Sequence, residues 1–431
     1  MAKRVQKGNI WIESVFATLF IYLFMYLVSL IPAFGIFDAF DAVGQALEDM
    51  EMTDVAFSKL REPLPPDTSI VLVNMGNLPR AGIAEQIRIV DKYSPKVIGM
   101  DSFFKGYLGD TLGTLSLASA IREAKAEIVM VGRIEQTDSL AKVHRGEEIY
   151  DHFYTSDSIF TGGTHIAMAN LDSDATFQDD VKICRMFPPK RKLTSGETHM
   201  AFAAKIAELY QPGITEALFK RKNEFEIINY RGDFVNFFEE DKFATRFYAL
   251  DWDQVLNEDF VPGLLKDKIV IFGFLGAEFG APEWEDRFFT PLNPKIAGRA
   301  NPDMFGPVIH ANILSMILNR DYVSSFSPAI EVILGVILCY LNVLLFSYVY
   351  WKYGVWYDGV SKLIQVTEVI LILFFIIQIF SSLSFKLELT YGLIALALAG
   401  DLLEIYFGVV KNLYTRAGRR LMFRKRKPVN I

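Results

Sequence analysis

The sequence contains few of the residues that build covalent cross-links or metal centres. Its 431 residues include two cysteines, Cys184 and Cys339, and five histidines. Cys184 lies in a long mixed segment and Cys339 in a hydrophobic run, so the two thiols are not expected to meet and a disulfide framework is excluded. None of the histidines stands in an HExxH or similar spacing. We therefore predict no metal site.

Motifs of enzymes and of nucleotide-binding proteins are missing as well. There is no Gly-x-Ser-x-Gly nucleophile motif. Residues 273–276 (GFLG) follow a strand-like run, but they lack the Lys-Ser/Thr of a P-loop and the spacing of a dinucleotide fingerprint. Between residues 36 and 327 acidic residues outnumber basic ones, which disfavours nucleic acid because phosphate binding needs a positive surface. The sequence therefore predicts neither an enzyme nor a cofactor.

Hydrophobic residues, in contrast, are plentiful and unevenly placed. They make up 51% of the chain, and the mean hydropathy is +0.24. They concentrate in four runs, each long enough to cross ~30 Å of hydrocarbon. We predict transmembrane helices over residues 15–34, 328–350, 363–383 and 389–410.

The first hydrophobic run admits two interpretations. It follows Lys3, Arg4 and Lys7, and a cleaved signal peptide has the same basic start. No small-x-small cleavage site follows in good position, and the run is long enough for a complete crossing. An uncleaved anchor is the favoured interpretation.

The distribution of basic residues predicts the orientation. Basic residues precede the first run, separate the second run from the third, and fill the tail, which has no acidic residue. By the positive-inside rule, residues 1–14 and 411–431 are expected in the cytoplasm, and residues 35–327 outside it.

The outer segment alternates between strand-like and helix-like stretches. Strands are expected at residues 69–74, 96–101 and 127–132, with helices at 81–93 and 112–124 between them. This alternation is typical of a parallel sheet covered by helices. The predicted fold is therefore an α/β extracytoplasmic domain with a mainly parallel sheet, plus four transmembrane α-helices.

The pattern recurs later in the outer segment. Helices are expected at residues 198–210 and 310–319, and strands at 226–230 and 268–272. The last of these strands is fully apolar, which suits a central position. The stretch of about residues 135–195 between the two sets is expected to be an insertion.

Several motifs, in order, resemble the CHASE2 domain, an extracytoplasmic sensory module of bacterial membrane receptors. The matching segments are residues 54–61 (DVAFSKLR), 67–74 (DTSIVLVN), 95–104 (PKVIGMDSFF), 110–120 with 128–131, 228–232 (INYRG), 265–273 (LKDKIVIFG), Asp286, Thr290-Pro291, Gly306 and 309–312 (IHAN). The resemblance covers most of residues 54–323, and three membrane helices directly afterwards are typical of the family. It implies a multi-pass protein of the bacterial cytoplasmic (inner) membrane.

Departures from the family limit what the resemblance implies. Residues 74–77 (NMGN) replace an acidic stretch, and residues 306–307 read Gly-Pro rather than Pro-Gly, so no ligand is carried over. Receptors of this family usually carry a cytoplasmic kinase or cyclase after the last helix, whereas residues 411–431 are too short for a catalytic domain. A separate output protein is therefore expected.

Five polar residues of the outer domain are candidates for a ligand or coupling site. Asp286, Thr290, His310 and Asn312 lie in the closing motifs and either line a pocket, couple the domain to the second membrane helix, or hold loops by bonding buried backbone. Asp101 follows a predicted strand and either faces a crevice at the carboxyl edge of the sheet or serves turn and capping geometry.

Two acidic residues, Asp401 and Glu404, fall within the fourth predicted span on one helix face. Intramembrane carboxylates are costly and often functional, for example in a proton path or in binding a partner's basic residue. The alternatives are contact with a neighbouring helix, favoured for Asp401, and hydration near the membrane surface, favoured for Glu404.

The basic tail is expected to contact anionic lipid headgroups, with docking of a cytoplasmic partner as the alternative. The residues concerned are Arg419, Arg420, Arg424, Lys425, Arg426 and Lys427.

These expectations lead to three functional hypotheses. The first is a non-enzymatic sensor, in which the outer domain binds a ligand or envelope component and relays its state to a separate partner through a population shift of the helices. The second is a structural scaffold or anchor subunit of a multiprotein envelope complex. The third, an enzyme or transporter, rests on Asp401 and Glu404 alone and is weak. An oligomer is expected on the first two.

Overall fold

The computed structural model describes residues 10–30, 54, 57–58, 64–106, 109–143, 149–171, 183–235, 246–281, 286–293, 301–387, 389–411 and 413. The chain forms two compact units. The globular unit is Asp54–Val323, and the membrane unit comprises Met1–Thr53 and Ser324–Ile431.

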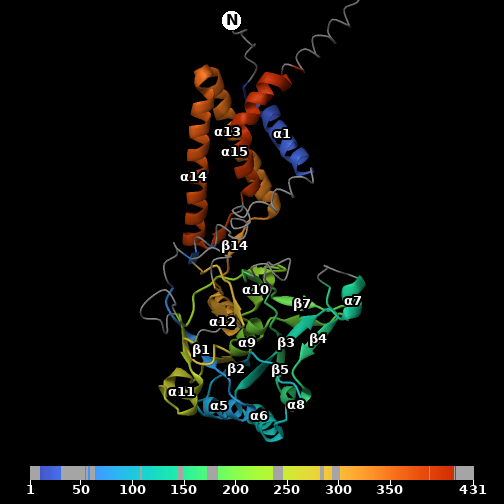
Figure 1. Ribbon diagram of the computed structural model, residues 1–431, viewed down its shortest axis with the longest axis vertical. Coiled ribbons are helices and arrows are strands. Elements are labelled where there is room, and N and C mark those ends of the chain that lie inside the picture. The colour runs from blue at the N-terminus through green and yellow to red at the C-terminus, as the bar shows by residue number, and fades with distance from the viewer. Residues whose placement is uncertain are drawn as a thin grey trace, which may run out of the picture. The chain divides into compact units, whose positions relative to one another are not determined.

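A seven-stranded sheet forms the centre of the globular unit (Figure 1). Its order is β10-β1-β11-β2-β3-β4, with β5 also paired to β3. All these pairings are parallel except that of β3 with β4. The strands are β1 (Asp67–Asn74), β2 (Val97–Met100), β3 (Glu127–Glu135), β4 (His152–Thr155), β5 (His165–Met168), β10 (Phe247–Leu250) and β11 (Ile269–Gly273).

Helices cover both faces of this sheet, which therefore lies in the middle of three layers (Figure 1). Helices α5 (Arg80–Lys92) and α6 (Thr111–Glu123) lie on one face. Helices α9 (Phe202–Tyr210) and α12 (Gly306–Asn319) lie on the other, and α11 (Trp252–Leu256) packs beside α5 and β1. Coverage on both faces explains why β11 is buried along its whole length and reads as an apolar run rather than an alternating one.

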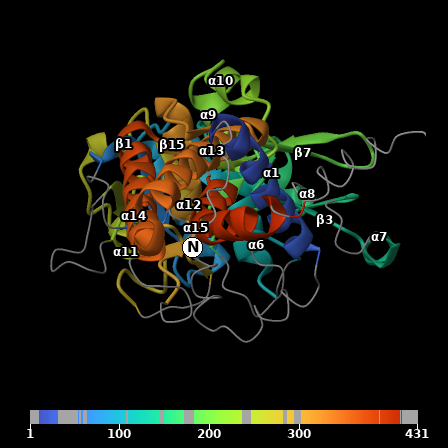
Figure 2. The ribbon, with the colours of Figure 1, turned by 90° about the horizontal axis from the view of Figure 1, so that it is seen from above.

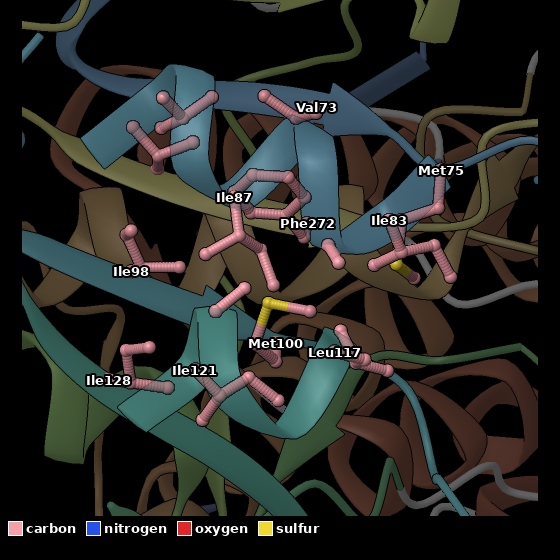
Figure 3. Close-up of a cluster of buried hydrophobic side chains, with 14 of the residues drawn as sticks. Val73, Met75, Ile83, Ile87, Ile98, Met100, Leu117, Ile121, Ile128 and Phe272 are labelled. Carbon is pink, nitrogen blue, oxygen red and sulfur yellow. The ribbon is translucent and has the colours of Figure 1, made fainter. Parts of the chain in front are cut away.

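The core between the sheet and α5 and α6 is built from alternate strand residues (Figure 3). Val73, Ile98, Met100 and Phe272 point from the strands toward Ile87 of α5. Alternation arises because successive strand side chains point to opposite faces of a sheet. Full burial of each such side chain stabilises the fold by about 1.5–3 kcal/mol.

The remaining short elements lie around the main sheet. Three pairs of strands form separate two-stranded sheets, β6 with β9, β7 with β8, and β12 with β13. The bounds are α7 (Asp138–Val143), α8 (Ser158–Thr161), β6 (Met186–Phe187), β7 (Lys190–Lys192), β8 (Thr198–Met200), α10 (Glu216–Lys220), β9 (Glu226–Ile227), η2 (Pro262–Leu264), β12 (Arg287–Phe288) and β13 (Met304–Phe305).

The structure confirms the first strand–helix alternation and the central position of residues 268–272, within one to three residues at each end. It corrects three other expectations. Residues 198–200 form strand β8, and the helix begins only at Phe202. Residues 226–230 contribute the short strand β9 to a side sheet with β6. Residues 135–195 are not simply an insertion, because β4 and β5 within them join the main sheet through β3.

The membrane unit is built mainly from four helices (Figure 2). They are α1 (Ile10–Ser29), α13 (Pro328–Tyr353), α14 (Tyr357–Leu383) and α15 (Thr390–Ile405), which continues as a π-helical turn over Tyr406–Val410. A 3-10 turn (Gly354–Trp356) joins α13 to α14, and short strands β14 (Ser324–Ser325) and β15 (Phe385–Lys386) pair in parallel. Helices α13 and α15 lie in the middle, with α1 and α14 on either side (Figures 1 and 2).

Helices α13 and α15 approach closely where two glycines meet. A Cβ atom added at Gly392 would lie 2.9 Å from the Cα of Gly335. Small residues permit such backbone contact and are typical of helix interfaces in membranes. A second link joins α1 to the end of α15, because Lys411 Nζ pairs with Glu13 Oε1 at 2.6 Å.

Three stretches are long and apolar enough to cross a membrane, Ile10–Val28, Pro328–Leu383 and Thr390–Val410. The middle stretch contains both α13 and α14, so the fourth predicted crossing is not separately shown. Helix α1 begins at Ile10, earlier than predicted, because Glu13 in its first turn interrupts the apolar run without ending the helix. The predicted end of this span, at residue 34, lies outside the described residues.

We predict that Gly99→Ala destabilises the globular unit. A Cβ atom at this position of β2 would lie 2.6 Å from Ile206 Cδ1 and 2.9 Å from Phe202 Cζ, both on α9. Overpacking of this kind typically costs 1–3 kcal/mol, or about 2 kcal/mol here. Thermal unfolding of the full chain in detergent measures the effect.

The matched control is Gly263→Ala, where nothing lies within 4 Å of the added Cβ and little change is expected. Equal melting temperatures for Gly99→Ala and the unsubstituted chain would contradict the close packing of α9 on β2.

Candidate functional site

A crevice opens at the carboxyl edge of the parallel sheet. It has a volume of about 480 Å³ and is lined by Met75, Asp101, Ser102, Phe103, Arg133, Ala169, Asn170, Leu171, Phe274, Asp286, Phe288, Gly306, Pro307 and His310. Most of these residues stand at or just beyond the ends of β1, β2, β3, β5 and β11, and others at the start of α12. Ligands of open α/β sheets commonly bind at this edge.

Asp101 directly follows β2 and lines the crevice. Its backbone N–H donates to the carbonyl oxygen of Phe272 at 2.8 Å, which continues the ladder to β11 and holds the residue in place. No hydrogen bond or ion pair of the carboxylate is found within the described part of the chain. Removal from water, aided by the nearby charge of Asp286, raises the pKa of Asp101 to about 7. An acid with this pKa changes charge near neutral pH.

His310 stands on the second turn of α12 and faces the same crevice. Its side chain is 4% exposed and packs edge-on against Phe202, with 5.2 Å between ring centroids. Burial lowers the pKa of His310 to about 4, so the imidazole is neutral at pH 7. The described residues provide no hydrogen bond to either ring nitrogen, which leaves the buried imidazole free to bond a ligand.

The start of α12 closes the crevice against the sheet. A Cβ atom at Gly273 would lie 2.2 Å from Pro307 Cγ, so a glycine is required at the end of β11 for α12 to reach this position. A Cβ atom at Gly306 would be 3.8 Å from Asp101 Oδ2. A side chain added at the first residue of α12 would therefore make ordinary contact with the carboxylate.

Two charged residues lie in the more open part of the crevice. Asp286 is exposed and adopts a left-handed backbone conformation (φ 57°) just before β12. Arg133 of β3 pairs with Glu135, and its guanidinium lies 5.9 Å from the ring centroid of Phe103. The charge of Arg133 is thus partly balanced within its own strand.

Thr290 and Asn312, the other two candidates, do not line the crevice. Thr290 donates from Oγ1 to Asp303 Oδ2 at 2.5 Å and from its backbone N–H to Asp303 Oδ1 at 2.9 Å. Asn312 accepts from the backbone of Arg231 and donates to the carbonyl oxygens of Gly232 and Val308. These bonds hold loops, in agreement with the alternative interpretation of both residues.

Sequence reasoning missed several lining residues, among them Ser102, Arg133, Asn170 and the aromatic side chains. The ends of the predicted strands carried a signal for some of them, since Ser102 and Phe103 directly follow Asp101. No sequence pattern indicated Asn170, because it lies in the stretch interpreted as an insertion. Its side-chain amide bonds the backbone of Ile134 in both directions, at 2.9 and 3.1 Å.

The described residues contain no group of three or more His, Cys, Asp or Glu side chains placed to hold a metal ion. The absence of a metal site therefore stays a prediction for the whole chain. Within the crevice, Asp101, Asp286 and His310 offer carboxylate and imidazole groups without forming such a group.

The candidates within the fourth predicted span belong to the membrane unit. Asp401 of α15 forms an ion pair with Lys362 of α14, as expected for helix–helix contact, whereas Glu404 is exposed. The sequence analysis overlooked Glu368 of α14, whose Oε2 is buried without a hydrogen bond. The six basic tail candidates lie outside the described residues.

We predict that Asp101→Asn stabilises the chain increasingly as the pH rises. The folded-state pKa of Asp101, about 7, exceeds its ordinary value of 3.8. The folded state therefore holds more protons between these values, and the unsubstituted chain loses stability as pH rises to 7. The difference between these two pKa values corresponds to a loss of at most about 4 kcal/mol in the free energy of unfolding. Melting temperatures of both chains in detergent, from pH 5 to pH 8, test this.

The stabilisation by Asp101→Asn should grow up to pH 7 and level off above it. Asp259→Asn, at an exposed position, is the matched control and should show no such trend. A constant difference between Asp101→Asn and the unsubstituted chain across this range would rule out a raised pKa.

Comparison with protein families matches residues 39–346 to the CHASE2 domain. Neither curated proteins nor solved structures yield a match. The matched region contains the complete crevice and extends into α13. It covers well over half of the chain and confirms the resemblance seen in the sequence motifs. With its parallel sheet, its crevice and its candidate membrane helices, the chain belongs to the CHASE2 domain family.

Proposed function

We propose that this protein is a non-enzymatic membrane sensor whose globular unit binds a ligand in the crevice and relays the occupied state to a partner protein. CHASE2 is a sensory domain family, with which a sensor role is consistent. The observation that carries the proposal is His310, a buried imidazole that faces the crevice and has no hydrogen bond from the described part of the protein. It lies in the same crevice as the partly exposed carboxylate of Asp101, which also lacks a partner there. Buried polar groups are normally satisfied, and unsatisfied ones in a cavity favour a ligand.

Helix α12 is the element best placed to carry the signal. Its first turns line the crevice through Gly306, Pro307 and His310. Its last turns bond the start of β1, because Ser315 Oγ donates to Asp67 Oδ2 at 2.6 Å and Asn319 Nδ2 donates to the same oxygen at 3.2 Å. Residues 320–327 then lead to α13.

The proposed mechanism is a population shift between two positions of α12. A ligand in contact with its first turn shifts this equilibrium only as far as it binds one position more tightly than the other. We further propose that α13 and α14 each cross the bacterial inner membrane once, which makes four crossings and places both termini in the cytoplasm. The basic tail is then positioned to contact anionic lipid or the partner.

A crevice-filling substitution tests the sensor proposal in cells. In Gly306→Leu, a side chain occupies the space beside Asp101, where the added Cβ makes only ordinary contacts. We expect unchanged membrane insertion, but an altered set of partner proteins recovered from membranes in mild detergent and an altered transcript profile. Quantitative mass spectrometry and RNA sequencing measure these effects.

The matched control is Gly263→Leu, an exposed position with open space around it. It should resemble the unsubstituted chain in both measurements. If Gly306→Leu recovers the same stoichiometric set of envelope proteins with no transcript change, the sensor proposal fails. The protein would then act as a structural scaffold of an envelope complex.

A further inference from the structure

We propose that the crevice binds an organic cation with an apolar body, whose ammonium group faces Asp101 and Asp286. The inference deepens the proposed sensor function by naming the ligand class for the same site. Direct binding measurements keep it separable from that function, since a cation can bind without producing any cellular output.

The first argument is the charge of the crevice. Asp101 and Asp286 line the same crevice, and the charge of Asp286 helps to raise the pKa of Asp101. In the described ranges, neither carboxylate accepts a hydrogen bond or forms an ion pair. Like charges held together without partners are unfavourable, and a bound cation relieves the repulsion.

The second argument concerns the positive groups that would otherwise favour an anion. The N-terminus of α12 carries a partial positive charge of about half an elementary charge, but Pro307 in its first turn has no N–H to donate. The charge of Arg133 is shared with Glu135. His310 is neutral at pH 7 because burial lowers its pKa to about 4. At pH 8, above the pKa of Asp101, the two carboxylates therefore dominate the field.

The third argument distinguishes an organic cation from a metal ion. The described residues offer no cluster of three metal-binding side chains. The walls of the crevice instead combine these polar groups with apolar side chains, namely Phe103, Phe274, Phe288, Met75 and Leu171. Aromatic faces attract organic cations as well as apolar groups, and a volume of about 480 Å³ lies in the range of small-molecule sites.

His310 adds a specific polar contact. Its 4% exposed, neutral imidazole can donate or accept one hydrogen bond at the base of the crevice. A ligand with a hydroxyl or amide group near its ammonium would use this contact. The structure thus points to an amine with an aromatic or branched apolar body.

Binding of a cation is linked to the protonation of Asp101. The charged and titratable groups facing it are Asp286, His310 and Arg133, together with the start of α12. Because the carboxylate form attracts the ammonium, binding should release a proton near pH 7 and become tighter from pH 6 to pH 8.

The test is isothermal titration calorimetry on the full chain in nanodiscs of zwitterionic lipid at pH 8. The probe is phenethylamine, compared with neutral 2-phenylethanol and anionic 3-phenylpropionate. We expect phenethylamine to bind at least tenfold more tightly than either of the others. Asp101→Asn and Asp286→Asn should each weaken it by about tenfold, whereas Asp259→Asn should not.

Three outcomes would overturn the inference. These are tighter binding of 3-phenylpropionate, binding of phenethylamine that is unchanged in both crevice variants, and no binding of phenethylamine at all. Misfolding does not account for weaker binding by Asp101→Asn if its melting temperature at pH 8 is equal to or above that of the unsubstituted chain. If binding is confirmed but Gly306→Leu leaves partners and transcripts unchanged, the sensor proposal fails while the ligand class stands.

Discussion

The insertion of β11 between β1 and β2 is the constraint on which the rest of the globular unit depends. β11 is the last of the seven strands in the chain, yet it hydrogen-bonds to two of the first. Its place brings Phe274 and Asp101 into the lining of one crevice, and its final residue, Gly273, lets Pro307 approach. The crevice depends on this distant pairing, because its lining residues come from segments far apart in the chain.

Most buried polar groups of the globular unit are satisfied by specific bonds. Asn74 uses its amide on Asp251 and Gly276, and Asn312 bonds three backbone groups or more. Gln86 Oε1 is one exception. In the crevice, neither the buried His310 nor the partly exposed Asp101 has a hydrogen bond from the described residues. Departures from local consistency are expected at functional sites, where stability is given up for binding.

Helix α12 contacts the crevice at one end and is bonded to the rest of the globular unit at the other. Its first turns belong to the crevice, while Asn312, Ser315 and Asn319 anchor its later turns to a loop and to β1. A displacement of the start of α12 would therefore act on these specific hydrogen bonds. In the membrane unit, the close contact of Gly335 with Gly392 and the ion pair of Lys411 with Glu13 couple α13 and α1 to α15.

The sequence by itself determined the alternation of strands and helices at residues 69–132, the central place of residues 268–272 and the hydrophobic membrane stretches. These features depend on local periodicity and on the lengths of apolar runs, which a linear pattern contains. The same pattern pointed to Asp101, Asp286 and His310 but could not separate them from Thr290 and Asn312, whose amide or hydroxyl groups are used by nearby backbone and by Asp303. Only the tertiary structure decided that β4 and β5 join the sheet, that Arg133 reaches the crevice and that Oε2 of Glu368 is buried. The reason is that pairing partners, desolvation and unmet hydrogen bonds are properties of segments brought together from across the chain.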